Sequence, residues 1–148
     1  ADVNTSCYNG WNPIIAAAFS GHVEVLQSLI DAKANLEHKQ HGGDTSTSLA
    51  AEKGHCMSLS LLLQAKSNPN STTDGNSETP LYKAAHNGHF DAVSILLEFK
   101  ADPSLLTGDN KSPVEGARQN GFEDTALLIE TVAVQAQTTT ATVMETAT

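Results

Sequence analysis

One eleven-residue phrase recurs four times in this 148-residue chain, and its spacing constrains the fold more than any other feature. The first copy, NPIIAAAFSGH, spans residues 12–22, and the others span residues 45–55, 79–89 and 112–122. Every copy has a glycine at the same place, so the copies follow one another at steps of 33, 34 and 33 residues. A fixed period of this length indicates stacked structural repeats, which bind through an extended surface.

Each copy, together with the residues that follow it, contains signals for two consecutive helices. A proline that is well tolerated at a first helical position occurs in three copies, at Pro13, Pro80 and Pro113. A residue able to cap the helix precedes each of them, and a glycine that favours a helix end follows eight residues later. A second apolar run with helical spacing comes next. These signals predict helices near residues 13–20, 23–32, 46–53, 56–65, 80–87, 90–99, 113–120 and 122–131, with almost no strand.

The repeated residues resemble those of the ankyrin repeat. The third copy has TPLYKAA at 79–85, GH at 88–89 and VSILL at 93–97, while the first has GWNP at 10–13 and GH at 21–22. The resemblance covers about residues 1–131. It implies an all-α ankyrin-repeat solenoid, in which every unit has a hairpin-like turn followed by two antiparallel helices.

The repeat register suggests a domain organisation. It divides the chain into four repeats, at residues 5–37, 38–70, 71–104 and 105–131. Residues 132–148 are rich in Thr and Ala and lack the large apolar residues needed for a packed face, which predicts a disordered tail or linker. Residues 1–4 align with the ends of later repeats, so we expect the chain to be a slice of a longer array, with a processed native terminus as the alternative.

The charge and cysteine content exclude several classes of function. The formal charge is −9, from 17 acidic and 8 basic residues, which argues against binding to a phosphate backbone. No apolar run has the length of a membrane span. Cys7 and Cys56 occupy non-equivalent repeat positions and form no disulfide framework, so we expect reduced thiols in an intracellular, cytoplasmic protein.

The histidines give no metal or catalytic pattern. His22, His55 and His89 share one repeat position at the corner between two helices, where hydrogen bonds that join the turns explain them better than metal ligation. His86 and His89 are separated by Gly88, which breaks the helical face that a metal pair needs. The chain has no phosphate-binding, nucleophile-elbow or zinc-protease motif. We expect no enzyme, no metal, no cofactor and no small-molecule substrate.

Several residues depart from the family pattern. Lysine stands after the second helix, where the family has glycine in a left-handed conformation, at Lys33, Lys66 and Lys100. Thr47 occupies a core position that other copies fill with aliphatic residues, so Thr47→Leu is expected to stabilise the array by roughly 1–2 kcal/mol. Glu130 replaces an aliphatic residue in the fourth copy, as suits a terminal cap.

The resemblance also implies a binding surface. In ankyrin-like arrays the turn tips and the outer side of each first helix line a concave face. Carried over by position, the candidate partner contacts are Tyr8, Asn9, Trp11, Phe19, His41, Asp44, Leu49, Glu52, Asn76, Glu78, Lys83, Asp109 and Lys111. We expect Trp11, Phe19 and Leu49 to be apolar anchors, although Trp11 also suits a role in covering its turn. Leu49 falls on a position that is usually polar and solvent-facing.

These observations predict a non-catalytic protein–protein interaction module, a scaffold or adaptor that binds a protein or peptide through its concave face. The acidic balance favours a partner that carries a basic segment. The alternative is a targeting or regulatory ankyrin arm of a larger enzyme, such as a kinase, a palmitoyltransferase or a ubiquitin-ligase subunit. A further idea is that Asn70 matches the turn asparagine that is hydroxylated in some ankyrin proteins.

Overall fold

The computed structural model describes residues 2–146, with side chains as far as residue 138, and it is all-helical. The eight helices are α1 (Pro13–Ser20), α2 (Val23–Asp31), α3 (Ser46–Lys53), α4 (Cys56–Gln64), α5 (Pro80–His86), α6 (Phe90–Glu98), α7 (Pro113–Gln119) and α8 (Glu123–Thr146). No strand occurs among these described residues. The prediction of turn–helix–helix units is confirmed, and the bounds of the first seven helices agree with the predicted ones to within one residue.

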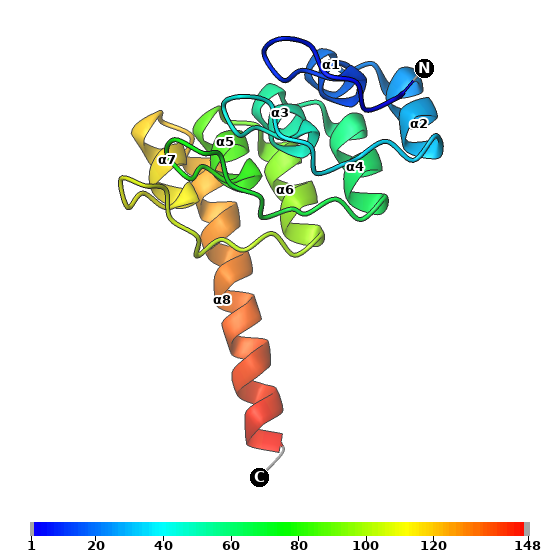
Figure 1. Cartoon of the computed structure of the whole chain (residues 1–148). Coiled ribbons are helices and arrows are strands. Elements are labelled where there is room, and N and C mark those ends of the chain that lie inside the picture. The colour runs from blue at the N-terminus through cyan, green and yellow to red at the C-terminus, as the bar shows by residue number, and fades with distance from the viewer. Residues whose placement is uncertain (1, 147–148) are drawn as a thin grey trace.

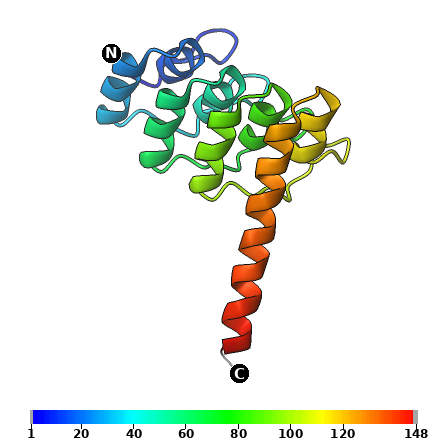
Figure 2. The same cartoon turned by 180° about the vertical axis from the view of Figure 1, so that it is seen from behind.

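The helices form two layers. The first helices of the units, α1, α3, α5 and α7, pack against one another in chain order, and the second helices, α2, α4, α6 and α8, do the same. Figure 1 shows the turns between units in front, and Figure 2 shows the second helices standing side by side. Each unit therefore contacts mainly its neighbours along the chain, as in a solenoid.

The ends of the helices follow the capping signals of the sequence. The side chain of Asn12 accepts a hydrogen bond from the backbone N–H of Ile15 at 3.1 Å, and Thr79 does the same for Tyr82 at 3.1 Å. The three lysines that replace glycine adopt the left-handed backbone that glycine favours, with φ of 63° at Lys33, 73° at Lys66 and 68° at Lys100. The expected conformation is kept although the residue is not glycine.

The repeated histidines join neighbouring units. Nε2 of His55 lies 3.0 Å from the carbonyl oxygen of Phe19 in the preceding unit, and Nε2 of His89 lies 2.9 Å from that of Glu52. The imidazole of His55 also packs on Gly21, where a Cβ atom would lie only 2.9 Å from Nδ1. The structural explanation of His55 and His89 is therefore confirmed.

The fourth unit replaces this histidine contact with two residues. The ring of Phe122 packs over Gly88, where a Cβ atom would come within 2.5 Å of the ring. Nδ2 of Asn120 donates a hydrogen bond to the carbonyl oxygen of His86 at 2.7 Å. One side chain thus supplies the packing and another supplies the hydrogen bond, a division that the sequence pattern alone does not predict.

Thr47, the polar residue at the core position of the second repeat, has a buried hydrogen-bond partner. Oγ1 of Thr47 donates a hydrogen bond to Oγ of Ser67 at 2.8 Å, and both residues are buried. The expectation that Thr47→Leu stabilises the array overlooked this contact. Leucine would remove the bond and leave the Ser67 hydroxyl without it in the core, which costs about 1–3 kcal/mol.

The last helix differs from its predicted bounds, 122–131. α8 begins at Glu123 and continues to Thr146, through the segment for which the sequence predicts a disordered tail. No glycine or proline stands between residues 123 and 146, so nothing in the chain stops the helix. α8 packs against α6 and α7, and its later part extends away from the array in both views (Figures 1 and 2). A helix without a packed face is marginally stable in water, so disorder of the tail in solution stays a prediction.

Candidate partner-binding surface

The candidate contacts come from the turns that precede α1, α3, α5 and α7 and from the sides of these helices. We call this predicted concave surface the turn face. Since it draws on all four units, its properties change along the array. Unit 1, with α1 and α2, supplies aromatic side chains, whereas the later units supply mainly charged ones.

The first unit presents three aromatic residues on the turn face, of which Trp11 and Phe19 form an aromatic cluster. Tyr8 is 99% exposed, and Trp11 and Phe19 are half-buried. The rings of Trp11 and Phe19 meet edge to face with centroids 5.0 Å apart, and Nζ of Lys53 lies 4.8 Å from the centre of the Phe19 ring. Aromatic side chains that are accessible in this way are common anchors at protein interfaces. The sequence identified the three rings but not Lys53.

The first turn is held by its neighbour. Oδ1 of Asn9 accepts a hydrogen bond from the backbone N–H of Trp11 at 3.2 Å, and the carbonyl oxygen of Asn9 accepts one from the backbone N–H of His41 at 3.2 Å. The imidazole of His41 packs against Gly10, where a Cβ atom would come within 2.8 Å. Asn9 and His41 are exposed, as expected for contacts at a turn tip.

Leu49 is not a solvent-facing anchor. Its side chain is 5% exposed, so the expectation that it faces solvent is wrong. The cause is its helix position, which faces the preceding unit. At the same position in the next unit, Lys83 reaches Glu52, and in the fourth unit a Cβ atom on Gly116 would lie 2.8 Å from the ring of Tyr82. Leu49 therefore belongs to the packing between units.

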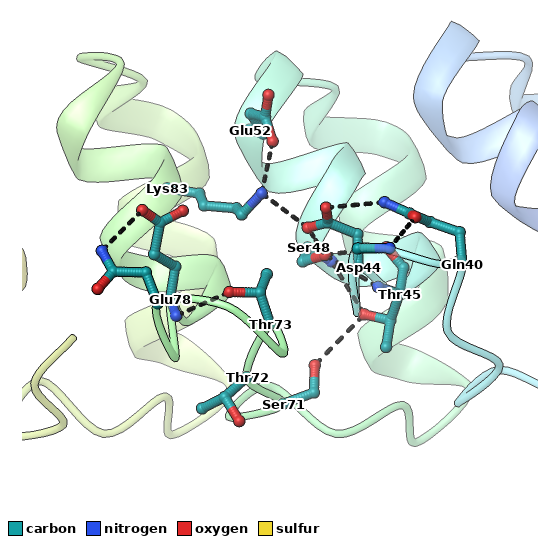
Figure 3. A network of polar contacts seen from close by, with 12 residues as sticks. Gln40, Asp44, Thr45, Ser48, Glu52, Ser71, Thr72, Thr73, Glu78 and Lys83 are labelled. Carbon is teal, nitrogen blue, oxygen red and sulfur yellow. Dashed lines mark hydrogen bonds and ion pairs between the residues drawn. The ribbon is translucent and has the colours of Figure 1, made fainter. Parts of the chain in front are cut away.

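A buried ion network lies in the middle of the turn face (Figure 3). Nζ of Lys83 is 2.7 Å from Oδ1 of Asp44 and 2.7 Å from Oε2 of Glu52. Asp44 is held further by Oγ of Ser48 at 2.9 Å and by Nε2 of Gln40 at 3.1 Å. Asp44 and Lys83 are therefore internal to the array, whereas the half-buried Glu52 keeps part of its carboxylate open to solvent.

The network also raises the pKa of its cation, Lys83. Burial by itself lowers the pKa of the Lys83 ammonium, but the hydrogen bonds and charges of Asp44 and Glu52 outweigh burial and raise this pKa above its ordinary value. The ammonium therefore stays charged and keeps the second and third units joined. Sequence alone could not reveal this, because Lys83 lies 31 and 39 positions after its two partners, in the next repeat.

Beside the network lies a small polar hollow of about 260 Å³, lined by Glu52, Glu78, Tyr82, Lys83, His86 and Asn87. The rings of Tyr82 and His86 are stacked, with centroids 5.6 Å apart. Glu78 accepts a weak hydrogen bond from Nδ2 of Asn76 at 3.4 Å. Tyr82 was absent from the predicted contacts, and no residue pattern in the sequence marks it.

Acidic residues of the third and fourth units surround Tyr82. Burial raises the pKa of its phenol, and the negative charges of Glu78, Asp109 and Glu115 raise it further. Asp109 is exposed, and the half-buried Lys111 donates a hydrogen bond to Gln119 at 3.4 Å. The turn face thus has an aromatic end on unit 1 and an acidic end on the later units.

No metal-binding cluster and no membrane-spanning helix occur in the part of the chain that the structure describes. Within the described residues no three His, Cys, Asp or Glu side chains gather closely enough to hold a metal ion. Among the helices of the described range, none combines the length and apolar character needed to cross a membrane. The described side chains of the turn face offer aromatic packing, charge pairing and hydrogen bonds.

Comparison with known proteins gives a consistent result. The family described as "Ankyrin repeats (many copies)" matches residues 48–97, and the family described as "Ankyrin repeat" matches residues 9–40. The chain is 37% identical over 83 residues to the human protein named "Ankyrin repeat and SOCS box protein 3", covering 54% of this chain and 16% of that protein. It is 37% identical over 76 residues to the protein of the same name from Bos taurus, covering 49% of this chain and 14% of that protein. The chain thus spans less than a fifth of the length of these relatives.

Proposed function

This chain belongs to the ankyrin-repeat family, and from that premise we propose that it binds a protein or peptide segment along its turn face. The ankyrin repeat is a non-catalytic protein–protein interaction module, so the finer question is where a partner binds and by what chemistry. The observation that carries the proposal is the aromatic cluster of Trp11 and Phe19, which is half-buried, with the exposed Tyr8 in the turn before it.

The chemistry of the partner is proposed from the two ends of this face. Tyr8, Trp11 and Phe19 suit an aliphatic or aromatic side chain of the partner, because burial of apolar area drives such contacts. The surface beside Tyr82 suits a lysine or arginine, because Glu78 lines the hollow there and the charges of Asp109 and Glu115 also act on the Tyr82 phenol. Lys83 already neutralises much of the charge of Asp44 and Glu52, so the basic segment is expected near units 3 and 4.

A peptide selection tests this proposal. A library of displayed peptides is selected on the full chain, and bound phage are eluted with the chain itself as competitor. We expect enriched peptides to contain an apolar residue and, some residues away, a lysine or arginine. The same selection is made on Trp11→Ala, which alters the turn face, and on Met57→Ala as the matched control. Met57 is 69% exposed on α4, away from the turn face. Loss of enrichment on Met57→Ala, with enrichment kept on Trp11→Ala, contradicts the proposed surface.

We also propose that this chain is the partner-binding section of a larger protein. Support comes from the relatives, whose name joins ankyrin repeats to a SOCS box and of which the chain spans only a small part. The alternative of a regulatory arm of an enzyme differs in what the remaining polypeptide contains. Sequencing of the complete transcript decides between them, because a catalytic domain beside the repeats would favour the enzyme arm.

The free thiols of Cys7 and Cys56 support an intracellular location.

A further inference from the structure

The polar hollow beside the ion network contains a carboxylate without a cation of its own. Glu52 and Glu78 both line this hollow, and both are half-buried. Oε2 of Glu52 already pairs with Nζ of Lys83 at 2.7 Å. The carboxylate of Glu78 accepts one weak hydrogen bond, from Asn76, and pairs with no cation in the described part of the chain. The hollow therefore has room for a positively charged group beside Glu78.

A phenol in the same hollow also lacks a partner. Tyr82 lines the hollow and is only 5% exposed, yet its hydroxyl forms no hydrogen bond with any residue that the structure describes. Polar groups in such places normally have a hydrogen-bond partner. The phenol oxygen is not fully enclosed, so a ligand in the hollow can reach it. This oxygen can accept a hydrogen bond from an N–H group.

The third feature of the hollow is a flat ring surface. The imidazole of His86 stacks on the ring of Tyr82, with the two planes 19° apart. Nδ2 of Asn120 lies 3.2 Å from Nδ1 of His86 and donates a hydrogen bond to the carbonyl oxygen of the same residue, so the next unit holds the ring in place. A planar guanidinium can lie on such a surface, whereas an ammonium has no flat side.

From these three features we propose that the hollow recognises an arginine side chain of the partner and prefers it to lysine. The inference rests on the proposed function, since it names one residue of the segment bound along the turn face. The guanidinium would pair with Glu78, donate a hydrogen bond to the hydroxyl of Tyr82 and lie over the ring of His86. Arginine suits this arrangement because its five N–H donors lie in one plane and because it is more weakly hydrated than the lysine ammonium.

Two small probes test this inference without a selected peptide. The amides of N-acetylarginine and N-acetyllysine each carry one positive charge, and each is titrated at low salt into the isotope-labelled full chain. NMR follows the backbone amides. We expect saturable shifts at Glu78, Tyr82 and Asn87 with the arginine probe, which should bind about threefold or more tightly than the lysine probe because it also contacts the rings.

Three variants link this binding to the named groups. Glu78→Gln keeps the shape of the side chain and removes its charge, so the saturable shifts should disappear with both probes. His86→Ala removes the flat surface and should bring the affinity for the arginine probe down to that for the lysine probe. The matched control is Asp91→Asn, which removes an exposed carboxylate of α6 outside the hollow and should change neither affinity. Well-dispersed amide spectra show that each variant is folded.

Three results overturn the inference. The first is equal affinity of the full chain for the two probes. The second is saturable binding that persists in Glu78→Gln or is lost equally in Asp91→Asn. The third is the absence of saturable shifts around the hollow with either probe. The proposed function fails in a different way, when peptides selected on the full chain bind Trp11→Ala as well as they bind the full chain, so the two failures are distinguishable.

Discussion

Thr47 and Ser67 form a buried hydroxyl pair at a place where the neighbouring units have two apolar residues. Their oxygens are 2.8 Å apart, and the equivalent pairs are Ile14 with Ala34 and Leu81 with Ala101. One unit has thus exchanged an apolar contact for a hydrogen bond between residues 20 positions apart. Such a pair is stable only while both members are present, because a buried hydroxyl that loses its partner keeps its desolvation cost.

The first prediction is a double-mutant cycle on this pair. Thr47→Leu alone and Ser67→Ala alone should each lower the free energy of unfolding by about 1–2 kcal/mol. The double variant Thr47→Leu/Ser67→Ala should recover this loss, since it recreates the Leu81–Ala101 pair of the next unit. Urea unfolding followed by circular dichroism gives the coupling. Additive losses in the double variant would show that the two hydroxyls do not act together.

The second prediction concerns the ion network. Lys83→Met should lower the free energy of unfolding by about 2–4 kcal/mol, because it leaves the carboxylates of Asp44 and Glu52 close together without their cation. Lys39→Met is the matched control, since Lys39 and Asp74 form an exposed ion pair at 3.4 Å, and it should cost less than about 1 kcal/mol. If the two substitutions cost the same, Lys83 does not join the units as described.

The third prediction is a loss of stability at alkaline pH. The pKa values of Lys83 and Tyr82 are raised in the folded protein, so the folded state holds both protons more tightly than the unfolded chain. The contribution of these two groups to the free energy of unfolding should therefore be lost as pH rises above about 10, after an earlier loss above about pH 9 from Cys56, whose pKa is also raised. Lys83→Met and Tyr82→Phe should each make the later fall shallower. A fall that is unchanged in both variants would assign it to other groups.

The fourth prediction concerns the later part of α8. Backbone amides after residue 132 should exchange with solvent far faster than those of Ala126 and Ile129, which are buried against the array. Hydrogen exchange measured by NMR resolves the two parts of the helix. Strong protection beyond residue 132 would mean that the tail is ordered by contacts of its own.

The sequence predicts the helices well because their limits are local. Prolines, capping side chains and glycines within a few residues set where α1, α5 and α7 begin and where α1 and α3 end. The conformation of Lys66 was likewise predictable, since its left-handed backbone depends on the turn it belongs to. The conformation of the segment after residue 131 was harder to predict. The lack of glycine and proline favours a continued helix, whereas the lack of a packed face favours disorder.

The binding surface was predicted less completely because burial there depends on the neighbouring unit. Leu49 and Lys83 share a helix position that resembles a solvent-facing one in a single repeat, and only stacking of the units covers it. The partners of Lys83 come from the previous unit, and no local pattern indicates them. The aromatic residues of unit 1 were named from their repeat positions, and of the three only Tyr8 is fully exposed.

The central claim is that a partner binds along the turn face through the aromatic cluster. It is tested most directly by calorimetric titration of a selected peptide into the full chain and into Trp11→Ala, Phe19→Ala and Met57→Ala. We predict that the dissociation constant rises about 30-fold or more in the two aromatic variants, as for loss of a buried anchor, and stays unchanged in Met57→Ala. An unchanged dissociation constant in both aromatic variants, with weaker binding by Met57→Ala, would contradict the claim and move the site to the second helices.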